Sequence, residues 1–361
     1  MKIYFDNIIF SLQRVGGISN YWSRLISALN ITKHRVTFFE SFNENIFKAN
    51  LDIETECEFS LRASLLRYMP LLKRLPSKSL FHSSYYRVSL QSSVANITTI
   101  HDFTYEYYVT GVRRYVHSIQ KKFSIKRSDG VICVSENTKN DLIKFYPKID
   151  KSMVRVIYNG VGNEFKVVSD IELLNKYGVP PTKDYILFVG GRSGYKNFDI
   201  AVEVLIELPE YAFVIVGGGE PDPKESEMLS ALDGRVYQLT GLSSADLNII
   251  YNHAFCLLYP SAYEGFGIPV VEAMKSGCPV VSTNLSSIPE VVGDAALLVD
   301  NPCVNSFIGK IKMLEDVQVK ESLISKGLER SKNYSWDKCC RETLAFYDEV
   351  WNKKFCANFK S

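Results

Sequence analysis

The chain has 361 residues, of which 46% are hydrophobic and 23% are charged. This composition is typical of a folded soluble protein and excludes wholesale disorder, and the length exceeds that of the usual single core, so two domains are expected. The formal net charge of +2 favours no class of partner by itself.

The cysteine spacing and the lengths of the apolar runs bear on the cellular location of the protein. The eight cysteines show no Cys-x-x-Cys spacing, so neither a zinc ribbon nor a redox pair is indicated. The sequence shows no signal peptide and no apolar run of about 18 residues. We therefore expect a cytoplasmic protein.

The first elements of the chain predict the opening of a doubly wound sheet. Lys2 to Phe5 is a short apolar strand, and the loop after it ends in Gly16 and Gly17. From Ile18 to Leu29 apolar residues recur at steps of three and four, which is typical of a helix with one buried face. Glycines after a first strand let the backbone approach a phosphate or a sugar closely, although a simple tight turn is the better explanation of a bare Gly-Gly pair.

Two later segments of this half are basic and amphipathic. Leu61 to Lys78 carries five basic residues and Val112 to Arg127 carries six, and neither contains an acid. Such segments can lie on an anionic membrane surface, and a solvated helix face is the other interpretation. Nucleic acid explains the charge less well, because no recognised binding motif accompanies it.

A β-rich run, Asn96 to Ile100, ends directly in His101 and Asp102. The carboxyl end of a parallel strand is where ligands bind in such sheets, so both side chains are placed to reach one. A lone histidine is more often structural than catalytic. Further strands follow at Gly130 to Val134 and Val154 to Ile157, and Ser135 is placed to cap the helix between them.

Residues 166–184 combine charge with glycine and proline, and we interpret them as a linker between domains 1–165 and 185–335. The second half then contains six short strands separated by segments of helix length. This alternation predicts a second parallel sheet, and the linker and strand count favour two sheets over one closed (β/α)8 barrel. The predicted strands are Tyr185 to Val189, Ala212 to Val216, Val236 to Leu239, Ala254 to Leu258, Pro279 to Ser282 and Ala296 to Val299.

The first of these strands is followed by Gly190, Gly191 and Arg192, and then by Lys196. Two cations four residues apart near a helix start can neutralise the charge that develops on a diphosphate leaving group. Two solvated loop charges are the alternative interpretation. The later glycine triplet in VIVGGGE lacks the Gly-x-Gly-x-x-Gly spacing, so a dinucleotide-dependent dehydrogenase is weakly supported.

The stretch YEGFGIPVVEAM, from Tyr263 to Met274, combines a loop glutamate, a glycine turn and a helix start. Proline suits the first turn of a helix, and Gly277 can end it in a left-handed conformation, so a helix is predicted from about Pro269 to Lys275. Its free N–H groups and partial positive charge favour an anion, most simply a phosphate. Glu264 and Glu272 would then flank that anion and accept hydrogen bonds from hydroxyls.

This stretch resembles the Glu-x7-Glu signature of the family 4 retaining glycosyltransferases, and the resemblance extends over nearly the whole chain except residues 43–79. It implies that Glu264 lies by the donor sugar, that Glu272 holds the ribose, and that Arg192 and Lys196 grip the diphosphate. His101 is implied to contact the donor sugar or the acceptor, so Glu264, His101, Arg192 and Lys196 are the catalytic candidates. The implied donor-binding residues also include Gly16, Gly17, Gly191, Leu242, Gly265, Phe266, Gly267 and Glu272.

The resemblance implies an α/β GT-B fold, with two facing doubly wound Rossmann-like domains and a final helix, 336–361, that crosses back onto the first domain. It implies transfer of a hexose, with retention, from a nucleoside diphosphate sugar to a glycan or lipid-linked glycan. No Asp-x-Asp pair is present to hold a metal, and no cofactor or nucleic acid is implied. The stretch SLQRVGGISNYW favours bacterial polysaccharide or O-antigen synthesis with GDP-mannose or a GDP-deoxyhexose. A UDP-sugar such as UDP-glucose, or a non-catalytic glycan-binding protein, is the alternative, and contact with the inner face of an anionic membrane is a further expectation.

Overall fold

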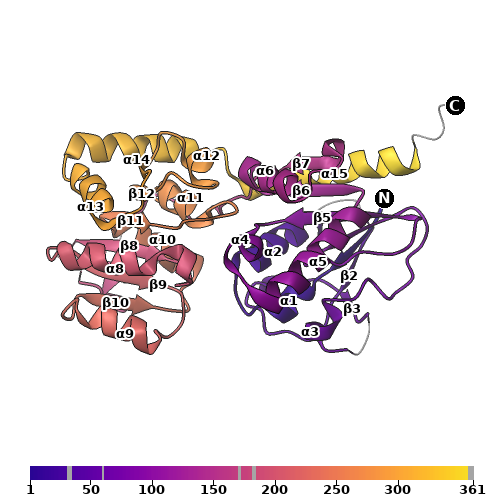
Figure 1. Ribbon diagram of the computed structural model, residues 1–361, viewed down its shortest axis with the longest axis horizontal. Helices are drawn as coiled ribbons and strands as arrows, with labels where there is room; N and C mark the ends of the chain where they lie inside the picture. The colour runs from indigo at the N-terminus through magenta and orange to yellow at the C-terminus, as the bar shows by residue number, and fades with distance from the viewer. Residues whose placement is uncertain (31–34, 59–60, 170–171, 181–183, 357–361) are drawn as a thin grey trace. The chain divides into compact units, whose positions relative to one another are not determined.

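The computed structural model describes residues 1–30, 35–58, 61–169, 172–180 and 184–356, and it divides the chain into two compact units (Figure 1). The first unit comprises Met1–Gly160 and the chain from Trp336 onward, and the second comprises Val161–Ser335. The segment predicted as a linker, 166–184, therefore belongs to the second unit. Its residues 170–171 and 181–183, like the chain end 357–361, lie outside the described residues.

The first unit contains a sheet whose described strands all run parallel, in the order β3-β2-β1-β4-β5-β6-β7. The interior strand β1 pairs on both sides, with Ile3 opposite Val36 and Leu80. Buried parallel strands have both faces covered, which explains their nearly continuous apolar sequences. The strands are β1 (Lys2–Asp6), β2 (Arg35–Phe39), β3 (Thr55–Glu56), β4 (Ser79–Ser83), β5 (Val94–Ile100), β6 (Gly130–Cys133) and β7 (Val154–Val156).

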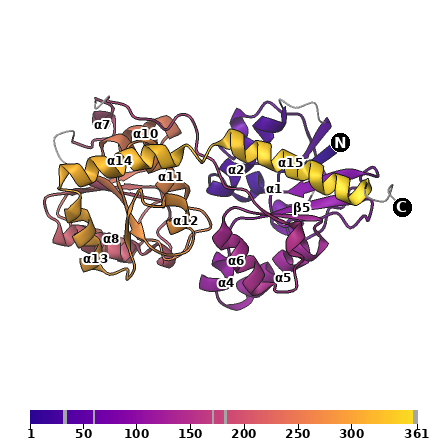
Figure 2. The same cartoon turned by 90° about the horizontal axis from the view of Figure 1, so that it is seen from above.

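Helices cover both faces of this sheet, with α2 and α15 on one face and α5 and α6 on the other (Figure 2). The side chain of Ser135 caps α6 as predicted, because its Oγ accepts the Thr138 N–H at 3.0 Å. The helices are α1 (Ile8–Leu12), α2 (Gly17–Asn30), α3 (Ala63–Leu66), α4 (Thr104–Tyr108), α5 (Gly111–Arg127), α6 (Glu136–Phe145) and α15 (Trp336–Phe355), with short 3-10 helices at Lys48–Asn50 and Lys151–Met153.

The last helix, α15, completes the core of the first unit. Its residues Trp336, Phe346, Tyr347 and Val350 are buried among side chains of α2 and of the sheet. The packing is close, because a Cβ added at Gly130 would lie 2.7 Å from Cγ2 of Val350. The far end of the chain thus supplies part of the hydrophobic core that the first 160 residues need.

The second unit has its own parallel sheet, in the order β10-β9-β8-β11-β12-β13. Counted from its first strand this order is 3-2-1-4-5-6, which is that of a dinucleotide-binding doubly wound sheet. Two separate open sheets confirm the predicted α/β architecture and exclude the closed barrel. The strands are β8 (Tyr185–Val189), β9 (Ala212–Val216), β10 (Val236–Leu239), β11 (Cys256–Tyr259), β12 (Val280–Thr283) and β13 (Leu297–Val299).

The helices of the second unit again form two layers, with α8 packed on α13 and α11 packed on α10 and α14. None of the helices in the described part of the chain is long and apolar enough to cross a bilayer. The helices are α7 (Glu172–Lys176), α8 (Phe198–Glu207), α9 (Pro223–Ser230), α10 (Ser244–His253), α11 (Ile268–Lys275), α12 (Ile288–Val292), α13 (Val304–Met313) and α14 (Val317–Ser331), with a 3-10 turn at Gly194–Lys196.

Candidate functional site

Two loops that leave neighbouring strands form the candidate site in the second unit. One loop follows β8 and carries Arg192 and Lys196, and the other follows β11 and carries Glu264. The strand order reverses between β8 and β11, and ligands of doubly wound sheets bind at such a point, outside the carboxyl ends of the strands. Residues 68 positions apart in the sequence therefore lie at one place.

Backbone and amide hydrogen bonds join the two loops to each other. Nδ2 of Asn197 donates to the carbonyl of Pro260 at 2.8 Å, and the N–H of Ala262 donates to the carbonyl of Tyr195 at 2.8 Å. Asn197 has a φ of 51°, a left-handed conformation that asparagine tolerates better than most residues. These bonds hold the short turn that carries Lys196 against the loop that carries Glu264.

The carboxylate of Glu264 is the centre of this arrangement. Its Oε1 forms an ion pair with Nζ of Lys196 and accepts hydrogen bonds from the hydroxyls of Tyr259 at 2.7 Å and Ser261 at 2.6 Å. Within the described residues no group donates to its other oxygen, Oε2. The side chains of Lys196 and Glu264 are 14% and 13% exposed. A carboxylate held through one oxygen can accept a ligand hydroxyl with the other.

The backbone of Glu264 is fixed as firmly as its side chain. Its N–H donates to Oγ of Ser286 at 2.9 Å, and its carbonyl accepts from Oγ of Ser287 at 2.9 Å. Both serines lie between β12 and α12, on the next strand connection along the sheet. Three successive loops of the sheet therefore position this one carboxylate.

Arg192 contacts the loop after β9 and the start of α9. Its Nε donates to Oε2 of Glu225 at 2.9 Å, and its two Nη atoms donate to the carbonyls of Gly217 at 3.2 Å and Gly219 at 2.9 Å. The side chain is 3% exposed. The described contacts thus pair Lys196 with Glu264 and Arg192 with the loop after β9, so the two cations do not share one partner here.

The glycine triplet after β9 makes the position of Arg192 feasible. Gly217, Gly218 and Gly219 have φ values of 90°, 80° and 72°, which other residues adopt only with strain. A Cβ on Gly218 would lie 2.5 Å from Nη1 of Arg192. The three glycines therefore leave the space that the guanidinium group of Arg192 occupies.

The helix α11 begins one residue earlier than predicted, at Ile268. The residue before it, Gly267, has a φ of 94°, and a Cβ there would lie 2.8 Å from Cδ1 of Ile288. No side chain caps α11. Pro269 has no N–H and that of Val270 donates to the carbonyl of Gly267 at 3.2 Å, so among the described contacts the Ile268 N–H is the first-turn donor left for an anion. Gly277 follows the helix with a φ of 75°, which confirms the predicted left-handed end.

Glu272 lies one turn into α11 and is half-buried. The hydroxyl of Tyr251 donates to its Oε2 at 3.1 Å. Burial, the largest effect, raises the pKa of this carboxyl to about 7, although the Tyr251 hydrogen bond acts in the opposite direction. Near neutral pH a ligand that donates hydrogen bonds to Glu272 would favour its ionised form.

Three predicted donor-binding residues have places that limit what they can contact. The ring of Phe266 is 3% exposed and packs edge-on against Tyr334, with 5.4 Å between ring centroids. Gly265 is buried beside it. Leu242 follows β10, which is two strands away from β8 in the sheet order. We infer that Phe266 supports the loop and can meet a ligand only through its backbone.

The other candidates lie in the first unit, at the carboxyl ends of its strands. Gly17 is the first residue of α2, and the carbonyl of Gly16 accepts from Oγ of Ser19 at 2.9 Å. His101 follows β5, and the edge of the Tyr21 ring packs against it with 5.0 Å between centroids. Burial lowers the pKa of His101 to about 4, so the imidazole is neutral at neutral pH.

A buried lysine fixes the loop that carries His101. Nζ of Lys121 donates to the carbonyl of Asp102 at 3.0 Å and forms an ion pair with Glu106 at 2.8 Å. The side chain of Lys121 is fully buried, and its Nζ lies 4.3 Å from the ring centroid of Phe103. The loop is therefore held by contacts from both α4 and α5.

Sequence reasoning missed the residues that hold the candidates in place. Tyr259 and Ser261 precede Glu264 by five and three residues, and only the turn between them brings both hydroxyls to one carboxylate oxygen. Glu225 completes a capping box with Asp222 at the start of α9. The sequence Asp-Pro-Lys-Glu signals that box, but not the partnership with Arg192.

Comparisons with known proteins agree on one family. A family model described as "Glycosyltransferase Family 4" matches residues 15–165, and one described as "Glycosyl transferases group 1" matches residues 169–330. The O-antigen chain mannosyltransferase B of Escherichia coli is 28% identical over 266 residues, which are 70% of this chain and 69% of that protein. The O-antigen chain mannosyltransferase RfbU of Salmonella typhimurium (strain LT2) is 30% identical over 224 residues, which are 61% of this chain and 60% of that protein.

Solved structures show the same fold at low sequence identity. Anabaena Alr3699/HepE, solved in complex with UDP and glucose, superimposes with a TM-score of 0.73 over 96% of this chain and 99% of its own. The two sequences are 18% identical, so this likeness concerns the fold alone.

Proposed function

This chain belongs to glycosyltransferase family 4 and has the GT-B architecture, and from that premise we propose that it is a retaining hexosyltransferase that uses a nucleoside diphosphate sugar. The observation that carries the proposal is the cluster of Glu264, Lys196, Tyr259 and Ser261 at the point where the strand order reverses. This cluster contains one cation and one carboxylate oxygen to which no described group donates, and α11 begins four residues after Glu264, at Ile268.

In the proposed mechanism the donor diphosphate lies at the start of α11. Lys196, the N–H of Ile268 and the positive end of the α11 dipole stabilise the charge that develops on it, and Arg192 contributes its positive charge from the loop after β8. Oε2 of Glu264 accepts a hydroxyl of the donor sugar, and Glu272 accepts the ribose hydroxyls. The bond from the anomeric carbon to the diphosphate breaks while the bond to the acceptor oxygen forms on the same face.

The departing diphosphate oxygen takes the acceptor proton, so this mechanism needs no separate base. His101 is neutral, and we place it at the donor sugar or the acceptor as a hydrogen-bonding residue. Gly16, Gly17 and Gly191 would let the backbone approach the ligand closely. The loop that contains Leu242 would lie near the nucleobase of the donor.

We propose that mannose or a related deoxyhexose from a GDP-sugar is transferred to a lipid-linked glycan in polysaccharide or O-antigen synthesis. Two relatives named O-antigen chain mannosyltransferases support this choice. The alternative is a UDP-sugar donor such as UDP-glucose, which the structural neighbour solved with UDP and glucose favours. A lipid-linked acceptor would bring the enzyme to the inner face of the membrane.

Donor turnover tests the proposal. Purified protein is incubated with GDP-mannose, GDP-fucose or UDP-glucose and with extracted membrane lipids, and release of the nucleoside diphosphate and the glycosylated product are measured by mass spectrometry. Turnover of a GDP-sugar supports the proposal, and turnover of UDP-glucose alone supports the alternative. Nucleotide binding without turnover of any donor identifies a non-catalytic binding protein.

A further inference from the structure

The helix α5 has its apolar side chains on the outside. Its buried positions are His117, Lys121, Ser124 and Ile125. Its exposed positions include five large apolar residues, spaced so that they form a stripe along one face. A surface helix of a globular protein normally has the opposite arrangement. The apolar residues, with their exposed fractions, are Val112 (78%), Tyr115 (69%), Val116 (38%), Ile119 (48%) and Phe123 (42%).

A second exposed apolar segment lies beside this stripe. A cavity of about 330 Å³ is lined by Tyr68, Met69 and Pro70 from one side and by residues of α5 from the other. Gln120 on α5 also donates to the carbonyl of Arg67. The two segments, about 50 positions apart in the sequence, thus lie side by side. We call their exposed large apolar residues together the apolar face: Leu65, Tyr68, Met69, Leu72, Val112, Tyr115, Val116, Ile119 and Phe123.

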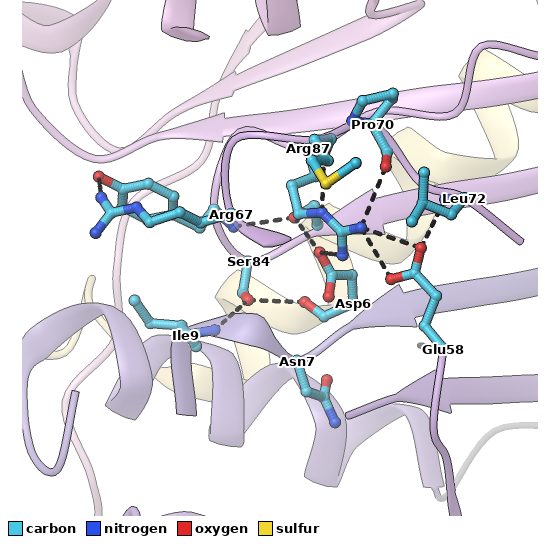
Figure 3. A network of polar contacts seen from close by, with 12 residues as sticks. Asp6, Asn7, Ile9, Glu58, Arg67, Pro70, Leu72, Ser84 and Arg87 are labelled. Atoms are coloured by element: carbon cyan, nitrogen blue, oxygen red, sulfur yellow. Dashed lines mark hydrogen bonds and ion pairs between the residues drawn. The ribbon is translucent and has the colours of Figure 1, made fainter. Parts of the chain in front are cut away.

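A buried ion network fixes the backbone of residues 69–72, which belong to the second exposed segment (Figure 3). The fully buried guanidinium of Arg87 forms ion pairs with Asp6 at 3.1 Å and Glu58 at 2.9 Å, and it donates to the carbonyls of Met69 and Pro70. Glu58 in turn accepts the N–H of Leu72 at 2.6 Å. Through Arg87 and Asp6, the backbone of residues 69–72 is therefore bonded to strand β1, so the exposed side chains in this stretch have a fixed position.

The helix α5 also carries exposed cations. Five of its basic residues (Arg113, Arg114, Lys122, Lys126 and Arg127) are exposed, and none of them forms an ion pair with another residue in the described ranges. Neither α5 nor residues 61–78 contain any acid. Large apolar side chains together with exposed cations match the two layers of an anionic bilayer, whose headgroups are charged and whose interior is hydrocarbon.

We propose that the apolar face is a docking surface for an anionic lipid bilayer, with its apolar side chains in the interface and the cations of α5 on lipid phosphates. Self-association through this face would place the cations of two copies against each other, which is unfavourable. The surface extends the proposed function by bringing the enzyme to a lipid-linked acceptor. Docking itself needs neither donor nor catalysis, so its failure is distinguishable from failure of that function.

Vesicle sedimentation tests the charges. The probes are vesicles of phosphatidylcholine and vesicles of phosphatidylcholine mixed with phosphatidylglycerol. We expect the full chain to sediment with the mixed vesicles, and Lys122→Gln with Lys126→Gln to lower the partition coefficient by on the order of tenfold. The control pair is Lys224→Gln with Lys312→Gln, two exposed lysines of the second unit, which should change nothing. Equal sedimentation of wild type and the Lys122 and Lys126 variant would overturn the proposal.

A second pair of variants tests the apolar side chains. We expect Ile119→Ser with Phe123→Ser to abolish sedimentation with the mixed vesicles while nucleotide binding and melting temperature are retained. The control is Ile206→Ser with Met313→Ser, whose side chains are 41% and 45% exposed, matched to the 48% and 42% of Ile119 and Phe123. Light scattering completes the test: a wild-type dimer that the Ile119 and Phe123 variant converts to a monomer would show an interface between copies and refute the proposal.

Discussion

The ammonium group of Lys196 has one partner in the structure, Glu264, and a second in the proposed mechanism, the donor diphosphate. In the described contacts it pairs with Oε1 of Glu264, and a donor diphosphate at the start of α11 would compete for the same ammonium group. The hydroxyls of Tyr259 and Ser261 would then remain on Oε1 and keep the carboxylate oriented. Glu264 would therefore keep its geometry when the cation moves to the phosphate.

This competition gives the first prediction. Glu264→Gln preserves the shape of the side chain but removes the charge that faces the donor sugar, so we expect the transfer rate to fall by about 10²- to 10³-fold with an unchanged fold. Steady-state assays and circular dichroism measure both quantities. Glu203→Gln, on the exposed side of α8, is the control and should keep the wild-type rate. Wild-type activity in Glu264→Gln would remove this residue from the mechanism.

Glu272 gives a prediction about pH. Burial raises the pKa of this carboxyl to about 7, so in the free protein it is largely protonated at pH 6. Ribose hydroxyls donate to the ionised form and lower the pKa, so binding should release a proton below about pH 7, and affinity should rise between pH 6 and pH 8. Calorimetry at pH 6 in buffers of different ionisation enthalpy measures that proton.

The matched variant for this measurement is Glu272→Gln. It cannot titrate, so any proton that it still releases comes from the terminal phosphate of the nucleotide or from other groups. The difference between wild type and variant isolates Glu272. An identical proton count in the two proteins would show that the ligand does not act on this carboxyl.

The raised pKa of Glu272 also makes the stability of the ligand-free protein depend on pH. The folded-state pKa of Glu272 lies above its ordinary value of 4.5, so ionisation costs stability as the pH rises from that value through about 7. Glu272→Gln should therefore be more stable than wild type at pH 8 and little changed at pH 4. Denaturant titration at the two pH values measures this difference.

Single residues of the site differed in how far the sequence could place them. Glu264, Lys196 and Glu272 lie in short motifs, so local spacing located them at strand and helix ends. The partners of Arg192 depend on a glycine loop 25 residues later, and the burial of Phe266 depends on Tyr334, which is supplied by a distant part of the chain. Local spacing carries no information about such partners.

At the scale of elements, the turn into α11 is the feature on which the site depends most. Gly267 has a φ of 94° and lies close to Ile288. An alanine there would have both an unfavourable backbone conformation and a steric clash of its Cβ with Ile288. We expect Gly267→Ala to lower the free energy of unfolding by about 1–3 kcal/mol and to weaken nucleotide binding. Chemical denaturation and calorimetry provide the two values.

The control for this prediction is Gly309→Ala. Gly309 lies inside α13, and a Cβ there meets nothing within 4 Å. Alanine should stabilise this helix by about 0.5–1 kcal/mol and leave binding unchanged. The account of the turn fails if both substitutions have the same sign.

Most elements could be predicted because their apolar patterns are local. The strands of the second unit form continuous apolar runs, and the structure places each within two residues of its predicted bounds. The family resemblance drawn from the sequence motifs does not extend over residues 43–79, and their conformation depends on Arg87 and the ion network rather than on periodicity. The structure adds β3 and α3 there. It also shows that the basic segment 112–127 is a helix with an exposed apolar face, which charge counting alone does not reveal.

At the scale of the whole molecule, the two units have separate hydrophobic cores, and α15 belongs to the first of them. Phe346→Ala should destabilise the first unit by about 3–5 kcal/mol, because the ring is only 3% exposed. Phe42→Ala, at a ring that is 89% exposed, is the control and should cost almost nothing. Denaturant titration measures both. A Phe346→Ala protein as stable as the control would mean that α15 is dispensable for the core.

Length and strand alternation predicted two domains, and the fold confirms the α/β class. The boundary could not be placed as well, because the structure divides the chain at Gly160 and not at residue 165. Val161 forms a parallel bridge with Ser335, and Lys275 donates to the carbonyl of Gly162 at 2.8 Å. These long-range bonds place residues 161–165 in the second unit. The composition of these residues does not predict that placement.

The central claim is that Lys196, Glu264 and the start of α11 form a binding site for a nucleoside diphosphate. Isothermal titration of GDP and of UDP into wild type, Lys196→Ala and the Lys224→Gln with Lys312→Gln control tests it most directly. We expect one of the nucleotides to bind wild type and the control at one per chain, and to bind Lys196→Ala at least tenfold more weakly, as expected for loss of a charge-assisted contact. Binding of neither nucleotide, or equal binding to wild type and Lys196→Ala, would contradict the account.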